Sequence, residues 1–322
     1  MRSSSPDKSR TYIQEVATRD GFQNEPVFIP TAAKIALINQ LSRVGLAKIE
    51  VTSFVSPKAI PALADAEAVM AGIDRVPGVC YTALVPNVRG AARAIASTVD
   101  ELNLVMSVSE THNLVNLRAT RQQSAAGLVQ TARLALEAGV SVNVSFSCVF
   151  GCPMEGDVDS EQALGWAARF VDEGVSGITL CDTTGMAYPS LVASLVQRFK
   201  SRWPKMTLTL HFHNTRGMGL ANVFAATRSG ADRFDTALGG IGGCPYAPGA
   251  TGNVCTEDTV HMLELMGYDT GVELRGLLRC AAELPPLVGH DVPSQLLKAG
   301  VRLKRHALPA SFDDIRARAA AR

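Results

Sequence analysis

The arrangement of apolar residues restricts this chain to few folds. Eight short runs are rich in β-branched and other apolar residues, and longer segments with helical periodicity separate them. Strands and helices that alternate in this way predict a parallel sheet covered by helices. The candidate strands are residues 11–16, 47–54, 79–86, 101–108, 141–150, 177–185, 207–214 and 232–243.

Three of the separating segments are typical amphipathic helices. Residues 31–46, 124–140 and 160–175 carry apolar residues three and four positions apart and reach a glycine near their ends. Thr31, which follows Pro30, is the expected N-cap of the first helix. Eight strands fit a closed barrel better than an open doubly wound sheet, and no GxGxxG follows the first strand. The sequence therefore predicts an α/β fold, a (β/α)8 TIM barrel with extra C-terminal helices.

One large domain accounts for most of the chain. We expect residues 1–10 to be a disordered N-terminal arm and residues 11–290 to be the catalytic barrel with its closing helices. Residues 291–322 are expected to form a helical, charged C-terminal tail.

Composition argues against several classes of partner. The formal net charge is +1 without a basic stripe, so binding to nucleic acid or to an anionic membrane surface is not expected. No apolar run is long enough for a membrane helix, and the polar start MRSSSPDKSR lacks the apolar stretch of a secretory signal. The 7 cysteines include no CxxC pair, which argues against a disulfide framework and a structural zinc site. We therefore expect a cytoplasmic protein.

In a barrel of this type, the active site lies at the carboxyl ends of the strands. His211 and His213 stand two apart near the end of the seventh predicted strand, so both imidazoles project to the same side. Neutral imidazoles can share a divalent cation, although the pair could also be ordinary polar strand residues. Asp20, after the first strand, would add a carboxylate oxygen, and Asn253 an amide oxygen. Two imidazoles and two hard oxygens suit Mg²⁺ or Mn²⁺ with a chelating substrate, and zinc remains possible by ligand type.

Three other charged residues at strand ends are candidates for the chemistry. Arg19 could stabilise a developing oxyanion, or it could form a structural ion pair with Glu50. Glu50, on the second strand, could be a general acid or base, or could orient Arg19. Asp182 could hydrogen-bond the metal-bound histidines, or could simply close a turn at the end of its strand.

A long uncharged loop follows the last predicted strand. The segment from Gly239 to Val254 contains six glycines and two prolines, together with Cys244 and Asn253. Such a loop in a compact domain is typically functional, and its glycines allow close approach of the backbone to a ligand. Taken alone, Cys244 could equally be a small buried hydrophobic residue.

At this point the motifs resemble a known family. The similarity runs in order from about residue 11 to residue 290, and it points to 3-hydroxy-3-methylglutaryl-CoA lyase within the metal-dependent (β/α)8 lyases and acyl-CoA condensing enzymes. The segments that carry it are EVATRDGFQNE (15–25), IEVTSFVSPK (49–58), SCVFGCPMEG (147–156), LHFHNTRG (210–217) and GGIGGCPYAPGATGNV (239–254).

The resemblance implies a retro-Claisen cleavage of a 3-hydroxy-3-methyl acyl-CoA, with coenzyme A as part of the substrate and products acetyl-CoA and acetoacetate. It also implies a homodimer. The implied metal ligands are Asp20, His211, His213 and Asn253. The implied catalytic residues are Arg19 for the enolate, Cys244 for protonation of its carbon, and Glu50 and Asp182 as active-site carboxylates. Substrate contacts are expected from Gln23, Ser53, Asn87 and Lys58, with Arg89 an alternative to Lys58 at the nucleotide.

The chain departs from the usual lyase pattern after the second histidine. It has Asn214 and Arg216 where the family usually has Asp and Tyr, and Arg216 could meet a phosphate of CoA or an acid group of the acyl chain. The exact acyl group therefore stays open. Two other functions also stay open: an acetyl-CoA-dependent condensing enzyme that uses a 2-oxo acid, and a non-catalytic barrel that binds acyl-CoA.

Overall fold

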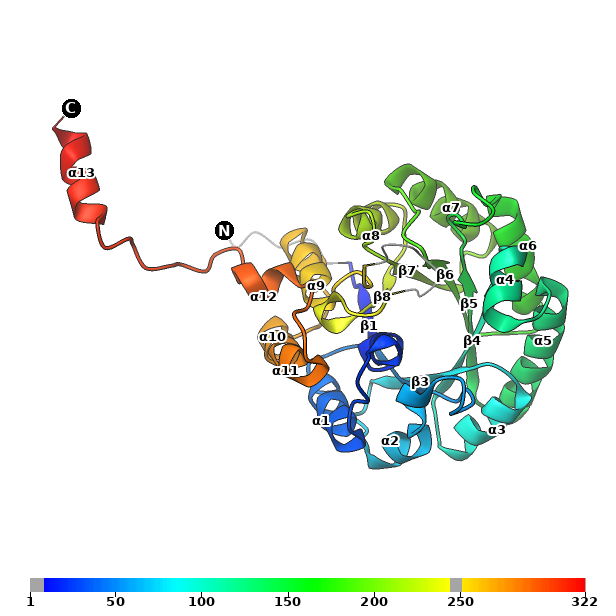
Figure 1. Ribbon diagram of the computed structural model, residues 1–322. Coiled ribbons are helices and arrows are strands. Elements are labelled where there is room, and N and C mark those ends of the chain that lie inside the picture. The colour runs from blue at the N-terminus through cyan, green and yellow to red at the C-terminus, as the bar shows by residue number, and fades with distance from the viewer. Residues whose placement is uncertain (1–8, 244–250, 322) are drawn as a thin grey trace, which may run out of the picture.

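Eight parallel strands form a closed barrel in the order of the sequence (Figure 1). The computed structural model describes residues 9–243 and 251–321. The strands are β1 (Tyr12–Glu15), β2 (Lys48–Ser53), β3 (Cys80–Val85), β4 (Glu101–Ser107), β5 (Ser141–Ser147), β6 (Gly177–Asp182), β7 (Thr207–Phe212) and β8 (Arg233–Thr236). The predicted (β/α)8 barrel is thus confirmed, and each predicted strand lies where the sequence placed it.

Helices surround the barrel and follow most strands. The longer helices are α1 (Thr31–Leu41), α2 (Ala66–Gly72), α3 (Val88–Ala96), α4 (Glu110–Leu117), α5 (Arg121–Glu137), α6 (Ser160–Val171), α7 (Pro189–Arg202), α8 (Gly219–Arg228) and α9 (Thr256–Leu265). After them come α10 (Leu274–Ala282), α11 (Leu284–Val288), α12 (Gln295–Ala299) and α13 (Phe312–Ala320). Short turns are η1 (Ala17–Gly21), η2 (Phe22–Asn24), η3 (Pro61–Leu63) and η4 (Leu238–Gly240).

The prediction that Thr31 is the N-cap of the first helix was wrong. Thr31 is the first residue of α1, and Pro30 occupies the N-cap position. The Thr31 hydroxyl instead donates to Asp65 Oδ2 at 2.7 Å. Lys34 donates to the other oxygen of the same carboxylate, also at 2.7 Å. The hydroxyl therefore ties α1 to the start of α2 rather than capping its own helix.

Closure of the ring joins the first strand to the last. β1 pairs with β8 from Tyr12 opposite Arg233 to Glu15 opposite Thr236, while its pairing with β2 is shorter. Residues more than 200 positions apart in the chain thereby become neighbours. Because all strands run parallel, their carboxyl ends, and the loops that follow them, meet at one mouth of the barrel.

The inside of the barrel holds a chain of buried polar side chains. Asn143 Nδ2 donates to Thr179 Oγ1 at 2.9 Å and to Asn103 Oδ1 at 3.0 Å. Asn103 Nδ2 in turn donates to Glu50 Oε1 at 2.7 Å. In contrast to this polar interior, the space between the strands and the surrounding helices is filled by apolar residues. The polar chain fixes the position of Glu50, since buried polar groups need partners of this kind.

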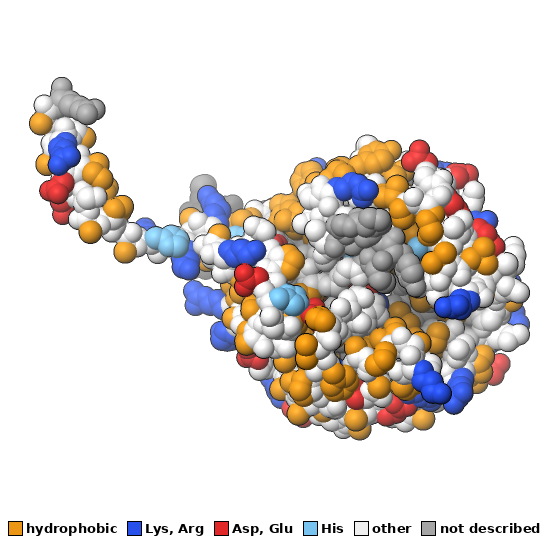
Figure 2. Space-filling model, in the orientation of Figure 1, with side chains coloured by type: hydrophobic (Ala, Val, Ile, Leu, Met, Phe, Trp, Pro, Cys, Tyr) orange, Lys and Arg blue, Asp and Glu red, His pale blue; other side chains and the backbone are white. Residues whose placement is uncertain are grey.

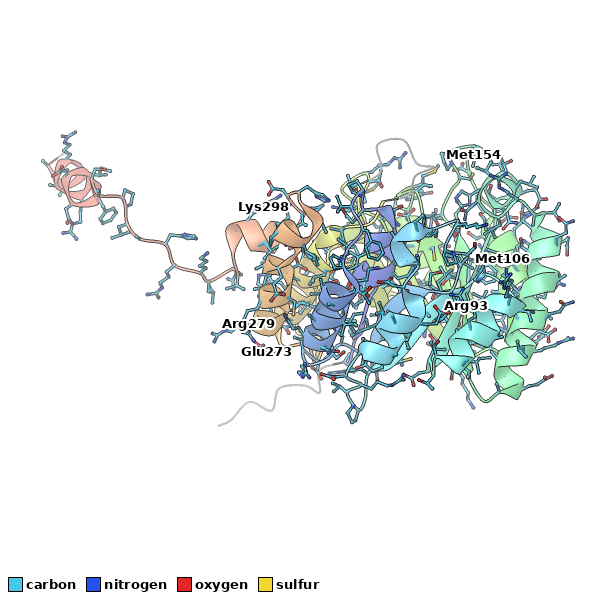
Figure 3. All side chains as sticks on the ribbon, turned by 60° about the horizontal axis from the view of Figure 1, so that its bottom comes forward. Arg93, Met106, Met154, Glu273, Arg279 and Lys298 are labelled. Atoms are coloured by element: carbon cyan, nitrogen blue, oxygen red, sulfur yellow. The ribbon has the colours of Figure 1, made fainter. Side chains whose placement is uncertain are left out.

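The C-terminal segment extends away from the barrel. α9 to α12 pack beside β1 and β8, whereas α13 lies at the end of an extended connection (Figure 1). Figure 3, in which Lys298 marks α12, shows the same separation from another side. α13 has no buried residue. At the other end, the described residues begin with Ser9 and Arg10, both bonded to Asp269, and residues 1–8 of the predicted arm lie outside the described part.

Within the residues that the structure describes, no helix is both long and apolar enough to cross a membrane.

Removing residues 301–322 should leave the barrel intact. Because α13 buries nothing, its loss removes no core contact. We expect the melting temperature of the truncated chain to stay within about 2 °C of that of the full chain. Differential scanning calorimetry of both chains measures this, and a fall of about 10 °C would show that the tail supports the fold.

Candidate active site

A deep cavity opens at the mouth of the barrel. Its volume is about 920 Å³, within the usual range for a small-molecule site. Figure 2 shows a hollow in the face that the helices surround. The predicted site residues that line it are Arg19, Asp20, Gln23, His211 and His213. Apolar residues from the segments around η2 and η3, among them Phe28, Ile60 and Pro61, form one wall.

Arg19 and Asp20 reach the cavity because the chain turns directly after β1. Residues Ala17–Gly21 form a single π-helical turn, a feature that is common at functional sites. Arg19 Nη1 donates to Asp20 Oδ1 at 2.8 Å, and Arg19 Nε donates to Glu50 Oε2. Glu50 thus orients Arg19, and the polar chain inside the barrel orients Glu50.

Neighbouring charges favour the ionised forms of Arg19 and Asp20, whereas burial raises the pKa of Glu50. Burial opposes the charge on Arg19, but the carboxylates of Glu50 and Asp20 raise its pKa above the usual value. Burial would also raise the pKa of Asp20, but Arg19, the two imidazoles and the Asn253 amide together outweigh it and lower that pKa to about 2. Asp20 is therefore a carboxylate at neutral pH, as a metal ligand must be.

His211, in β7, and His213, just after it, turn the same ring atom toward each other. His211 Nε2 and His213 Nε2 are 3.3 Å apart, and His211 Nε2 lies 3.8 Å from Asp20 Oδ2. On the other side of its ring, His211 Nδ1 lies 3.3 Å from Asp235 Oδ2. This Asp235 contact fixes the His211 ring and directs the lone pair of Nε2 toward the cavity, as carboxylates commonly do for metal-binding histidines.

These distances suit a shared divalent cation. Two ligand atoms about 2.2 Å from one ion and at right angles to each other are separated by about 3.1 Å. Ligand atoms of Asp20, His211 and His213 all lie within 4.8 Å of one another. Burial, with the neighbouring His211, lowers the pKa of His213 to about 4, so this imidazole is neutral and able to coordinate. The three residues therefore form a possible metal site.

Asn253 lies beside this cluster with its amide nitrogen toward Asp20. Asn253 Nδ2 donates to Asp20 Oδ2 at 2.8 Å and to the Ile241 carbonyl at 3.1 Å. Among the described residues, no hydrogen bond reaches the buried Asn253 Oδ1. Half a turn about the last side-chain bond would exchange the two atoms and present the oxygen, which is the atom that a cation binds.

The glycines of the predicted loop let its two described ends approach closely. A Cβ on Gly252 would lie 1.6 Å from the Gly240 carbonyl oxygen. Gly242 has a φ of +87°, and a Cβ there would lie 2.7 Å from Asn253 Nδ2. Backbone bonds then join the returning end to β7, since Val254 N donates to the Phe212 carbonyl at 2.9 Å. The loop therefore needs glycine at these positions to bring Asn253 to Asp20.

Glu15 fastens three segments of the site together. Its Oε1 accepts the backbone N–H groups of Ala17, at 2.8 Å, and Leu238, at 2.9 Å. Its Oε2 accepts the Thr256 hydroxyl at 2.7 Å. One fully buried carboxyl therefore holds the turn that carries Asp20 and both ends of the glycine loop.

Asp182 is the last residue of β6 but is not among the described residues that line the cavity. Its Oδ1 accepts the N–H groups of Met186 and Ala187, which is the turn-closing role that the sequence left open. Within the described residues, its buried Oδ2 has no hydrogen-bond partner. Burial raises the pKa of Asp182 to about 6. Its neighbours Cys181 and Thr183 both line the cavity.

Three residues expected at the substrate lie outside the described cavity lining. The buried Ser53 hydroxyl donates to the Leu84 carbonyl at 3.2 Å. Asn87 caps α3 by accepting the Gly90 N–H at 3.0 Å. Lys58 is exposed, although Ala59 and Ile60, which follow it, do line the cavity.

The predictions for Arg216 and Cys244 remain to be compared with the structure. Arg216 donates to the carbonyls of Thr184, at 3.1 Å, and Gly185, at 2.7 Å, so it connects the loops after β6 and β7. Cys244 lies outside the described residues, and the preceding Gly243 lines the cavity.

Sequence reasoning missed several residues of the site. Asp235 could have been found as a buried carboxylate on the strand next to the two histidines, and Glu15 as one at the end of β1. Nothing in the sequence pattern marked the residues that α4 contributes to the cavity. Those are His112, Asn116, Leu117 and Arg118.

Known proteins of similar sequence indicate the family of this chain. A sequence model of the HMGL-like family matches residues 10–283. The chain belongs to the HMGL-like family. It is 46% identical over 293 residues to the hydroxymethylglutaryl-CoA lyase YngG of Bacillus subtilis, covering 91% of this chain and 98% of that enzyme. The (R)-citramalyl-CoA lyase of Chloroflexus aurantiacus is 39% identical over 308 residues, 89% of this chain and 94% of that enzyme.

The solved structures agree with this family membership. An HMG-CoA lyase from Acenitobacter baumannii, in complex with coenzyme A and 3-methylmalate, superposes with a TM-score of 0.91 at 48% identity. The match covers 95% of this chain and 100% of that one. This HMGL-like chain thus shares its barrel with a solved HMG-CoA lyase that holds coenzyme A.

Substitution of Asp20 by Asn should weaken metal binding. The change removes the anionic oxygen and keeps the volume, so we expect the Mn²⁺ dissociation constant to rise by about 100-fold. Titration followed by electron paramagnetic resonance of free Mn²⁺ measures it. Asp232→Asn, just before β8 at the opposite end of the barrel, is the matched control and should bind as the unaltered chain does. Equal affinity in both variants would remove Asp20 from the site.

Glu15 should make stability depend on pH. Burial raises the pKa of Glu15 from 4.5 to about 7, so folding favours its protonated form. Its contribution to stability is therefore complete below pH 4.5 and falls as the pH rises through about 7. Glu15→Gln cannot ionise, and it should reduce the loss of unfolding free energy between pH 5 and pH 8 by on the order of 2 kcal/mol. Urea unfolding at both pH values measures this, and an unchanged difference would contradict it.

Proposed function

We propose that this chain is a divalent-metal-dependent carbon–carbon lyase. Its substrate would be 3-hydroxy-3-methylglutaryl-CoA or a close 3-hydroxyacyl-CoA, and its products acetyl-CoA and acetoacetate. The observation that carries the proposal is the cluster of Asp20, His211 and His213 beside Arg19 in the cavity of an HMGL-like chain. We further propose Mg²⁺ or Mn²⁺ as the ion and a homodimer as the assembly.

Asp20, His211 and His213 would hold the cation, with Asn253 as a fourth ligand after its amide turns. The bound cation supplies a positive charge that polarises the substrate hydroxyl and makes its proton easier to remove. Asp235 keeps the ring of His211 in place, and Glu15 keeps the two ends of the loop together. Asp235 and Glu15 would therefore position the metal-binding residues without contacting the substrate.

The bond-breaking step needs a proton acceptor and a place for negative charge. When the C3 hydroxyl proton leaves, the oxygen forms a C=O bond and the electrons of the C2–C3 bond move into the thioester enolate. Asp182 is our proposed acceptor of that proton, because a carboxyl whose pKa is about 6 can accept and release protons near neutral pH. Glu50 and Asp20 engage Arg19 Nε and Nη1, which leaves Nη2 to stabilise the enolate oxygen.

Protonation of the enolate carbon completes the reaction. We propose that the Cys244 thiol donates this proton and produces the methyl group of acetyl-CoA, after which the proton taken from the hydroxyl restores the thiol. Cys244 directly follows Gly243, which lines the cavity, and this proximity in the chain supports the assignment. Gln23, whose Nε2 donates to Asp20 Oδ1 at 3.0 Å, would help to position the acyl group.

A cleavage assay tests the proposal. The chain is incubated with 3-hydroxy-3-methylglutaryl-CoA and Mg²⁺, with and without excess EDTA, and acetoacetate is measured. We expect metal-dependent release of acetoacetate, and citramalyl-CoA in parallel assays defines the acyl group. Release of free thiol only from acetyl-CoA plus a 2-oxo acid would instead favour a condensing enzyme, and binding of the thioester without turnover would favour a non-catalytic barrel.

A cysteine pair tests the proposed proton donor. Cys244→Ala should lower kcat by about 100-fold or more, because it removes a proton donor from the transition state. Cys80→Ala is the matched control, since Cys80 begins β3 at the end of the barrel away from the mouth. Full activity of Cys244→Ala would exclude the assignment, whereas an equal loss in both variants would point to general damage.

A further inference from the structure

One positive charge in the cavity has no described counter-charge. The charged side chains of Arg19, Asp20, Glu25 and Asp235 line the cavity, and each is paired: Arg19 with Asp20, Glu25 with His290, and Asp235 with His211. Arg118 also lines the cavity, but within the part of the chain that the structure describes its guanidinium makes no hydrogen bond or ion pair. Arg118 is an exposed residue at the edge of the cavity, and an unpaired cation at the entrance to a cavity attracts anionic ligands.

The backbone holds Arg118 at a defined place on the rim. Arg118 follows the last residue of α4 with φ 55° and ψ 34°, in the left-handed region, where residues other than glycine are uncommon. Its N–H closes α4 by donating to the Leu114 carbonyl at 3.0 Å. Residues in this conformation cluster at functional sites, because the surrounding structure must support their strain.

The acidic side chains of the same region are already engaged. Glu110, in the first turn of α4, accepts from Arg121 Nε at 2.8 Å. Glu155, in the loop after β5, accepts the Thr111 N–H at 2.6 Å. Neither carboxylate is bonded to Arg118. Its charge is therefore available to a ligand.

Arg118 lies across the mouth from the metal-binding cluster. α4 follows β4, and in the closed order β4 is three strands from both β1, which leads to Asp20, and β7, at whose end the two histidines lie. In Figure 1, α4 lies on the opposite side of the barrel from β1 and β8. The part of a ligand that reaches the cluster of Asp20 and the two histidines is therefore a different part from the one that contacts Arg118.

We propose that Arg118 is a specificity residue that binds an anionic group of the thioester substrate remote from the reacting carbon. That group is a carboxylate at the far end of the acyl chain or a phosphate of CoA, because a guanidinium binds both through the same fork of N–H donors. The proposal rests on the proposed function, in that the ligand is an acyl-CoA. Arg118 would be the residue of that site that selects a negatively charged thioester.

Binding measured without turnover tests this directly. Calorimetric titration with 3-hydroxy-3-methylglutaryl-CoA in EDTA compares the unaltered chain with Arg118→Asn, since asparagine tolerates the left-handed conformation. We expect the dissociation constant to rise about tenfold in Arg118→Asn. Arg118→Lys should recover part of the affinity at low salt. The matched control is Arg133→Asn, on the outer face of α5, where the arginine pairs with Glu173, and it should leave the affinity unchanged.

Two further ligands identify the anionic group. If the tenfold loss also occurs with free CoA and disappears with the 3-hydroxy-3-methylglutaryl thioester of pantetheine, the group is a phosphate. If the loss persists with the pantetheine thioester, the group is the acyl carboxylate. Equal affinities of Arg118→Asn and the unaltered chain for all three ligands would overturn the proposal. Because no turnover is needed, a failed cleavage assay would reject the proposed function without deciding the role of Arg118.

Discussion

Closure of the barrel between β1 and β8 is the constraint on which the site depends. The pairing of Tyr12–Glu15 with Arg233–Thr236 brings the start of the chain to its last strand. Asp20, five residues after β1 ends, then lies beside His211 at the end of β7 and beside Asn253 in the returning loop. Glu15 strengthens this junction, because its carboxyl binds backbone or hydroxyl groups on both sides of it. Without ring closure, no local interaction would bring these groups together.

Charge burial determines how the assembled groups behave. Burial alone would favour the protonated form of Asp20, but Arg19, which lies 2.8 Å away, acts with the two imidazoles and Asn253 to keep it ionised. Arg19 is held in turn by Glu50, and Glu50 by Asn103 inside the barrel. The same burial lowers the pKa of His213, which keeps its imidazole neutral. The ionised Asp20 and the neutral His213 imidazole are in the forms that bind a divalent cation. At His211, burial is outweighed by the Asp235 and Asp20 carboxylates, which raise its pKa, so metal binding there must displace a proton more readily held than usual.

The sequence was sufficient for the fold because its strand and helix patterns are regular and the parallel barrel follows from their alternation. It also indicated Asp20, His211 and His213, since residues at strand ends must meet at the mouth. It could not show that β2 shifts its register after Glu50, nor that the Ser53 hydroxyl donates to the Leu84 carbonyl. It could not distinguish a capping Asn87 from a substrate contact either, because both roles suit an asparagine after a strand. Arg118 was missed since its place depends on how α4 ends and packs, which is a tertiary property.

The central claim is that three side chains from distant parts of the chain share one divalent ion. Anomalous X-ray scattering from crystals of the protein soaked in Mn²⁺ tests it most directly. The account predicts one strong peak within about 2.4 Å of a carboxylate oxygen of Asp20 and of the Nε2 atoms of His211 and His213. A peak bound elsewhere in the barrel, or no peak at saturating Mn²⁺, would contradict it.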